Sequence, residues 1–292
     1  KMKMAYWLVA VIVCLLSCSG EPVPRDIAGY HLDEPVQIIA LDNALREISG
    51  LAYFNERLYA LQDEDGRVYQ IDPQTGKVLR DDKFWKDGDF EGIEVTDALG
   101  IAMKSNGHLY AFDLYDPDDD RTVKIDIELS RDMNFEGLGF DRQSGQILLA
   151  AKRRPEVIQK EIYAVDASFK SMQYRQMTIL DQTVLFDRHM GGKKKGLARL
   201  RKNLAAATYS FNPSGIAVHP LTGDRFIISS PVPQLLVMSE SWEVRDVIFL
   251  DQILFRQPEA ICFDPAGNLY IGNEGGGAKG NILKFELHEA ND

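Results

Sequence analysis

A four-residue phrase recurs five times in this chain, and it constrains the fold more than any other feature. Each copy has an apolar residue or Pro, then Ser or Glu, then Gly or Ala, then Ile or Leu. The copies are Ile48-Ser49-Gly50-Leu51, Phe90-Glu91-Gly92-Ile93, Phe135-Glu136-Gly137-Leu138, Pro213-Ser214-Gly215-Ile216 and Pro258-Glu259-Ala260-Ile261. Their third positions are 42, 45, 78 and 45 residues apart. Strand-rich repeats of about 40–45 residues are typical of a β-propeller, in which each repeat forms one four-stranded blade.

Short apolar runs and turn residues follow the phrases, as a blade requires. In the first repeat, runs at 58–61 and 68–71 are preceded by the turns Asn55-Glu56 and Asp65-Gly66. Gly, Asn and Asp suit the backbone conformations of tight hairpin turns. Each phrase is therefore expected to open the first strand of a blade.

Each blade also needs an outer strand. In the first four repeats the candidates are residues 78–84, 123–129, 174–180 and 243–250. The last repeat ends at Leu287 with no room for one, and residues 36–43 resemble segments that end other repeats. We expect this N-terminal strand to complete the last blade and close the ring, which removes an exposed sheet edge.

The 78-residue step allows either a sixth, degenerate blade or a long insertion. Residues 187–203 contain seven Lys or Arg and lack the alternation of a strand. We therefore predict an all-β propeller of five blades over residues 36–290, with six as the alternative and a basic insertion near 183–211.

The N-terminus has the pattern of an export signal. Lys1 and Lys3 precede an apolar run that is too short for a comfortable membrane span of about 20 residues. Leu15-Leu16-Ser17-Cys18 resembles a bacterial lipobox. The prediction is a signal peptide over 1–17, lipidation of Cys18 and a tether over 18–35; the alternative is an ordinary signal peptide. The protein would then be exported and anchored by lipid to a bacterial membrane, in the periplasm or at the cell surface.

Charge and cysteine content narrow the range of partners. The formal net charge of −11 argues against nucleic acid as a partner. The basic stretch at 188–202 either contacts an anionic partner or lipid headgroups, or is a solvated loop.

Cys262 lies in an apolar run and is expected to be a small buried hydrophobic residue. We expect a monomer.

The phrases and their order resemble the SdiA-regulated family of bacterial exported propellers. The resemblance covers about residues 36–287, and it implies a periplasmic or membrane-anchored propeller without implying an activity. More distantly, residues 258–270 are similar to blades of gluconolactonase-like and esterase-like phytase propellers. Some of those bind calcium in the central channel and hydrolyse lactones or phosphate esters.

The second residue of each phrase is the candidate for chemistry, because the first strand of a propeller blade lines the central channel. The expected ring is Ser49, Glu91, Glu136, Ser214 and Glu259, and the ends of the second strands add Asp63, Glu64, Lys104, Lys152, Ser230 and Glu274. Three carboxylates in a narrow channel would repel one another unless something compensates.

Three arrangements would compensate this charge. The carboxylates could accept hydrogen bonds from the next blade or pair with Lys104 and Lys152. Alternatively, Glu91, Glu136 and Glu259 could bind Ca²⁺, with neutral oxygens from Asn134, Asn212 and Asn273. The third arrangement is a pocket for a charged ligand.

Two functions follow from these arrangements. The favoured one is a binding protein that takes a small molecule, glycan or protein at the funnel. The alternative is a calcium-dependent hydrolase of phosphate esters or lactones. The sequence does not settle whether the protein is an enzyme, since no histidine falls in the expected ring and no catalytic motif is present.

Overall fold

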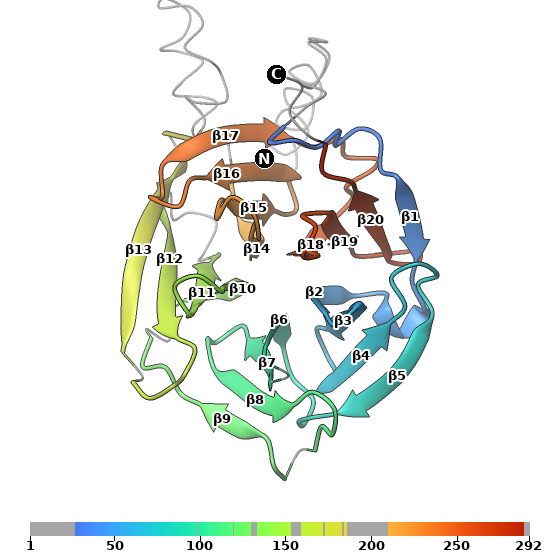
Figure 1. Cartoon of the computed structure of the whole chain (residues 1–292), viewed down its shortest axis with the longest axis vertical. Coiled ribbons are helices and arrows are strands. Elements are labelled where there is room, and N and C mark those ends of the chain that lie inside the picture. The colour runs from blue at the N-terminus through green and yellow to red at the C-terminus, as the bar shows by residue number, and fades with distance from the viewer. Residues whose placement is uncertain are drawn as a thin grey trace, which may run out of the picture.

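The computed structural model describes residues 27–288 except 98, 119, 130–132, 153–158, 172, 183 and 186–209. Five four-stranded antiparallel sheets surround a central axis as the blades of a propeller (Figure 1). The prediction of an all-β propeller is confirmed, with five blades and not six. Most of the basic insertion near 183–211 lies outside the described residues.

Each of the first four blades uses consecutive strands, from an inner strand at the channel to an outer strand at the rim. The first blade contains β2 (Ile48–Phe54), β3 (Arg57–Gln62), β4 (Arg67–Ile71) and β5 (Val78–Lys83). The second contains β6 (Phe90–Thr96), β7 (Leu99–Lys104), β8 (Leu109–Asp113) and β9 (Val123–Ile125). The third contains β10 (Phe135–Asp141), β11 (Gln146–Ala151), β12 (Gln159–Asp166) and β13 (Tyr174–Asp181). The fourth contains β14 (Pro213–Val218), β15 (Arg225–Ser229), β16 (Gln234–Met238) and β17 (Val244–Phe249). The outer strands fall where the sequence predicts them, although β9 is shorter than expected.

The fifth blade joins the two ends of the domain. Its strands are β18 (Pro258–Phe263), β19 (Leu269–Asn273), β20 (Asn281–Phe285) and β1 (Gln37–Ala40). β1 pairs antiparallel with β20 from Gln37 opposite Lys284 to Ala40 opposite Asn281 (Figure 1). A 3-10 turn, η1 (Asn43–Leu45), then leads into β2. The predicted closure of the ring by the N-terminal strand is confirmed.

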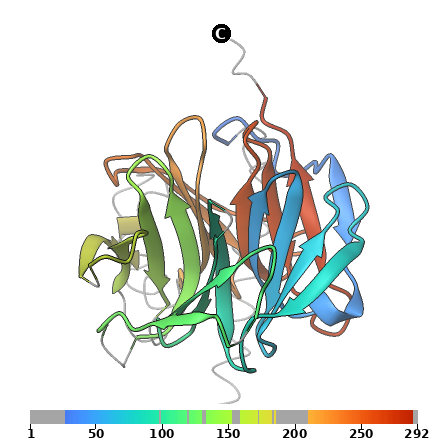
Figure 2. The ribbon, with the colours of Figure 1, turned by 60° about the horizontal axis from the view of Figure 1, so that its bottom comes forward.

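Neighbouring blades stand side by side around the axis (Figure 2). The core is divided into five apolar clusters, each between two neighbouring blades. Alternate residues of one strand enter different clusters. For example, Ile147 and Leu149 pack against the second blade, whereas Leu148 and Ala150 pack against the fourth. Because both faces of a blade are covered, its inner strands are nearly continuous apolar runs. The stability of the ring therefore depends on the contacts between blades as well as on those within them.

The packed domain begins earlier than the sequence predicts. Ile27, Tyr30 and Leu32 lie in the segment expected to be a tether, yet they are buried in the cluster between the fourth and fifth blades. The Tyr30 hydroxyl donates a hydrogen bond to the carbonyl of Gly267. The expected boundary at residue 36 is corrected to Ile27 or before, because burial of these three apolar side chains fixes the segment on the propeller.

The Gly of the recurring phrase lets neighbouring inner strands approach one another closely. A Cβ atom on Gly50 would lie 2.7 Å from the backbone N of Ile93 and 2.8 Å from the Cα of Gly92. A Cβ on Gly92 would lie 2.6 Å from the Cβ of Leu138 in the next blade. Gly at these positions is thus required by the space between blades.

We expect Gly50→Ala to lower the free energy of unfolding by about 1–3 kcal/mol, because the added methyl group meets backbone atoms that cannot move aside. Urea denaturation measures this change. The matched control is Gly277→Ala, since no atom lies within 4 Å of a Cβ at Gly277. Equal stability of both variants with the parent would contradict the close packing of the first two blades.

Candidate functional site

The recurring polar residue is the extra residue of a β-bulge in all five inner strands. In each inner strand the pairing with the second strand shifts register between the first and third positions of the phrase. A bulge interrupts the alternation of a strand and re-aims the side chain at that point. Repetition of one bulge in five blades brings these side chains to the same end of the channel.

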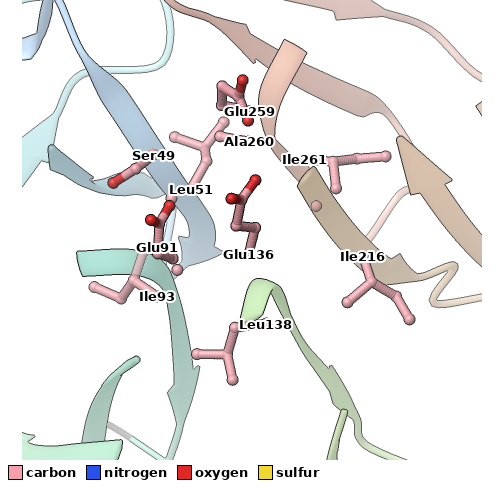
Figure 3. Close-up of a pocket in the computed structure, with 13 residues that line it drawn as sticks. Ser49, Leu51, Glu91, Ile93, Glu136, Leu138, Ile216, Glu259, Ala260 and Ile261 are labelled. Carbon is pink, nitrogen blue, oxygen red and sulfur yellow. The ribbon is translucent and has the colours of Figure 1, made fainter. Parts of the chain in front are cut away.

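Four of the five ring residues line one cavity at this end, which we call the channel mouth (Figure 3). They are Ser49, Glu91, Glu136 and Glu259. The fourth positions of the phrases form its apolar floor: Leu51, Ile93, Leu138, Ile216 and Ile261. The site is therefore a small cavity with an acidic wall and an aliphatic base.

Ser214, the fifth ring residue, has a structural contact. Its hydroxyl is buried and donates a hydrogen bond to the carbonyl of Pro258, at 2.6 Å. This bond joins the fourth blade to the fifth. Ser214 is not among the residues that line the channel mouth.

Glu136 is held by two neighbours. The Nζ of Lys152 lies 2.5 Å from its Oε2, and the Nδ2 of Asn134 donates to its Oε1 at 2.8 Å. Burial acts to lower the pKa of Lys152, but Glu136, Glu259 and Glu91 outweigh burial and raise it. The Lys152 ammonium is thus a cation built into the acidic wall.

Lys104 does not take the equivalent place beside Glu91. Its Nζ donates to the carbonyl of Asp87 at 3.3 Å and lies 4.6 Å from the centre of the Phe90 ring. Burial lowers its pKa. The expected pairing of both lysines with ring glutamates is found for Lys152 alone among the described residues, because the flexible Lys104 side chain lies over an aromatic ring instead.

Burial and mutual repulsion raise the pKa of two wall carboxyls well above their usual range. Burial raises the pKa of Glu91 to about 10, with further repulsion from Glu136 and Asp89. Burial likewise raises the pKa of Glu259 to about 8, although a hydrogen bond with Ser230 opposes the shift. Both shifts favour the protonated form of these carboxyls near neutral pH.

More carboxylates extend the acidic wall outward. Burial raises the pKa of Asp63, and Glu47 and Glu64 add to the rise. Burial and then Asp63 raise the pKa of Glu274, whose Oε2 accepts a hydrogen bond from the Nε2 of Gln257 at 2.7 Å. The electrostatic interactions of Glu274 also reach Lys152 and Glu136, so these outer groups continue the acidic wall.

Ser230, which the sequence places with Lys152 among the ends of the second strands, hydrogen-bonds Glu259. Two contributors were missed from the sequence. Asp89 repels Glu91 and Glu136, and its position just before a recurring phrase was a usable signal. Glu94 accepts a hydrogen bond from the backbone N of Phe140 in the next blade, at 3.1 Å, and burial raises its pKa to about 7. The contact between blades that was considered for ring carboxylates is therefore made by Glu94, which the phrase does not include.

Several polar atoms near the ring have no hydrogen-bond partner among the described residues. The hydroxyl of Ser49 is one, and the side-chain oxygens of Asn212 and Asn273 are others. Such groups are costly to bury, so each is a candidate contact for a bound molecule.

Metal binding remains a prediction. No group of three or more His, Cys, Asp or Glu side chains is placed to hold a metal ion in the described parts of the chain. Coordination of Ca²⁺ by Glu91, Glu136 and Glu259 would therefore need the side chains to rearrange. Of the histidines, His219 is buried away from the mouth, where its Nδ1 accepts hydrogen bonds from backbone N–H groups.

The structure tests the prediction for Cys262 but not the prediction for the N-terminal segment with Cys18. Cys262 is free and buried, as expected. Cys18 and residues 1–17 lie outside the described residues. Within the described part of the chain, no helix has the length and apolar character needed to cross a membrane.

Comparison with known proteins identifies the family and the fold. A family model described as SdiA-regulated matches residues 28–276. No curated protein sequence matches. A structure described as a nidogen/laminin complex is similar at a TM-score of 0.50 and 12% identity, covering 82% of this chain and 76% of that one. Myxococcus xanthus glutaminyl cyclase gives a TM-score of 0.45 and 18% identity, over 69% of this chain and 73% of that one. At these identities the structural likeness concerns the fold alone.

Proposed function

The chain belongs to the SdiA-regulated family, and we propose that it is a binding protein whose channel mouth holds a positively charged ligand. The observation that carries this proposal is the excess of carboxyl groups in the mouth. Glu91, Glu136 and Glu259 come from three blades, and within the described structure Lys152 forms its ion pair with Glu136. The remaining carboxyls either keep protons or accept a cation from solution.

A hydrolase would need more than this cavity offers. Ser49 is the hydroxyl that lines the mouth, but no described residue accepts a hydrogen bond from it, as a base that activates a nucleophile would. The described residues that line the cavity include no histidine. Binding is therefore better supported than hydrolysis of a phosphate ester or lactone.

We further propose that the propeller works outside the cytoplasm, held to a membrane by a lipid on Cys18. The support is the sequence pattern of residues 1–18. The packed domain starts close behind this pattern, since Ile27 is already buried. The channel mouth would then bind ligands within a short distance of the membrane surface.

A thermal-shift panel of cationic, neutral and anionic compounds tests the binding proposal. Cationic compounds are expected to raise the melting temperature, because they bind the folded state at its acidic mouth. Glu259→Gln is expected to weaken this binding by about tenfold or more, the usual size for loss of a charged hydrogen-bond partner. The control is Glu128→Gln, which changes an exposed carboxylate. Selective binding of neutral or anionic compounds, or equal binding by both variants, would overturn the proposal.

A further inference from the structure

We propose that the ligand of the channel mouth presents a primary ammonium group, which binds against Ser49, Glu91 and Glu259, and that the ligand is a small aliphatic diamine or polyamine. This inference rests on the proposed function, since it names the chemical class of the positively charged ligand. Two observations carry it. The side chains of Ser49 and Glu91 lack partners within the described structure, and the ammonium group of Lys152 is bound by a carboxylate of the same wall.

Ser49 supplies the first argument, through comparison with Ser214. Both occupy the second position of the recurring phrase, and both are the extra residue of a bulge. Ser214 is 1% exposed, and its hydroxyl binds the carbonyl of Pro258. Ser49 is 5% exposed, yet its hydroxyl has no partner within the described structure, and it lines the mouth. A buried hydroxyl without a partner costs about 1–3 kcal/mol, so a ligand that donates a hydrogen bond to Ser49 removes this cost.

Glu91 supplies the second argument. It lines the same cavity as Ser49, and no cation or hydrogen-bond donor of the described residues contacts its carboxyl. Lys152 is bound to Glu136, and Lys104 lies over Phe90. The groups that face the cavity are therefore acceptors that can take a positively charged donor.

The chemistry of these acceptors favours an ammonium over a metal ion. Ca²⁺ draws six to eight oxygens to about 2.3–2.6 Å, which requires carboxylates that already converge. No such convergence exists among the described acidic side chains. An ammonium needs three acceptors at about 2.8 Å, which is a wider and less crowded arrangement. The Lys152 ammonium, 2.5 Å from Oε2 of Glu136, already binds one carboxylate of the same wall.

The lining of the mouth limits the rest of the ligand beyond its ammonium group. Aliphatic side chains line the cavity together with the carboxyls (Figure 3). Asp63 and Glu274 are further carboxylates of the acidic wall, and they repel each other. A second positive charge, one short aliphatic chain away from the first, would relieve this repulsion. This favours a diamine or polyamine over a monoamine.

Binding is expected to release protons. The groups that act on Glu91 are Asp89 beside it, Glu136 from β10, Glu259 from β18 and Lys152 after β11. Without a ligand, Glu91 and Glu259 hold protons at neutral pH, and an ammonium favours their ionised forms. Affinity for the amine should therefore increase as the pH rises from about 6.5 to about 8.5.

Isothermal titration calorimetry of the full chain tests the inference, with 1,4-diaminobutane and spermidine as probes, 1,4-butanediol as the neutral match and CaCl₂ as the metal. We expect the amines to bind, the diol to give no heat, and the affinity to rise by about tenfold or more over this pH range. Titrations in buffers of different ionisation enthalpy should show proton release. Ser49→Ala is expected to weaken binding by about threefold to tenfold, the equivalent of about one hydrogen bond. The matched control Ser214→Ala should leave affinity unchanged.

The outcomes separate this inference from the proposed function. Binding of Ca²⁺ but not of amines would overturn the ammonium assignment and leave the cation-binding function in place. Amine binding that is unaffected by Ser49→Ala and by pH would also overturn it, since a merely acidic surface would behave in that way. Failure of every cation to bind would overturn both.

Discussion

Asp141→Asn is expected to lower the free energy of unfolding by about 3–5 kcal/mol, the largest loss we predict for a single substitution. Asp141 ends β10 in the third blade, and its Oδ2 lies 2.8 Å from the Nη2 of Arg225 at the start of β15 in the fourth. The two residues are 5% and 4% exposed. Removal of one partner leaves the other charge buried without compensation, which is far more costly than loss of a surface ion pair.

Asn removes the negative charge of Asp141 but keeps its hydrogen bonds to the following turn. The other carboxylate oxygen of Asp141 accepts hydrogen bonds from the backbone N–H groups of Gln143 and Ser144 in the following turn, at 3.1 and 3.2 Å. An amide oxygen can replace it there. Arg225 keeps its position over the Trp242 ring, 4.9 Å away, but loses its counter-charge.

Denaturant unfolding measures the loss, with Asp81→Asn as the matched control. Asp81 binds Arg67 at 2.9 Å on the surface, where the Arg67 and Asp81 side chains are 35% and 49% exposed. That variant should lose less than about 1 kcal/mol. The double variant Asp141→Asn, Arg225→Met should recover part of the loss, because the buried charge is gone. Similar losses for the Asp141 and Asp81 variants would show that the buried pair contributes no more than a surface pair.

Glu91→Gln is expected to do the opposite and stabilise the propeller, by roughly 2–4 kcal/mol near pH 8. Burial and repulsion raise the pKa of Glu91 to about 10 in the folded protein, against 4.5 for the ordinary side chain. The folded state therefore binds more protons than the unfolded state between these values, and its stability falls as the pH rises through them. A neutral amide has no such penalty.

The pH dependence of the difference is the decisive measurement. Below about pH 4.5 both states carry a protonated Glu91, so the variant and the parent should unfold at nearly the same denaturant concentration. The difference should then grow as the pH rises through neutral. Glu128→Gln, at an exposed position, should show no such growth. A Glu91→Gln variant that is less stable than the parent at alkaline pH would mean that the carboxylate is compensated in the folded protein.

The molecule thus holds opposite kinds of buried charge. The Asp141–Arg225 pair is a compensated charge that holds two blades together, whereas Glu91 is a carboxyl whose ionisation, as the pH rises, weakens the fold. Stability alone does not account for an acidic cluster that lowers it. The positively charged ligand that we propose for the channel mouth would supply the missing charge.

The fold was largely readable from the sequence. The spacing of the phrases, the turn residues between apolar runs and the missing outer strand of the last repeat predicted five blades and their closure by residues 36–43. These are properties of residues close together in the chain, or of one pattern repeated along it. The exception was the segment from Ile27 to Leu32, whose polar surroundings concealed three buried side chains.

The site was readable only as a set of candidates, and the tertiary structure decided what each candidate does. Ser49 and Ser214 have the same place in the same phrase, yet one faces the cavity and the other joins two blades. Lys104 and Lys152 both stand at the ends of second strands, yet one lies over an aromatic ring and the other binds Glu136. A repeat fixes where a residue stands within its blade. The partner of its side chain can belong to a different blade, and only the packing of the closed ring brings the two together.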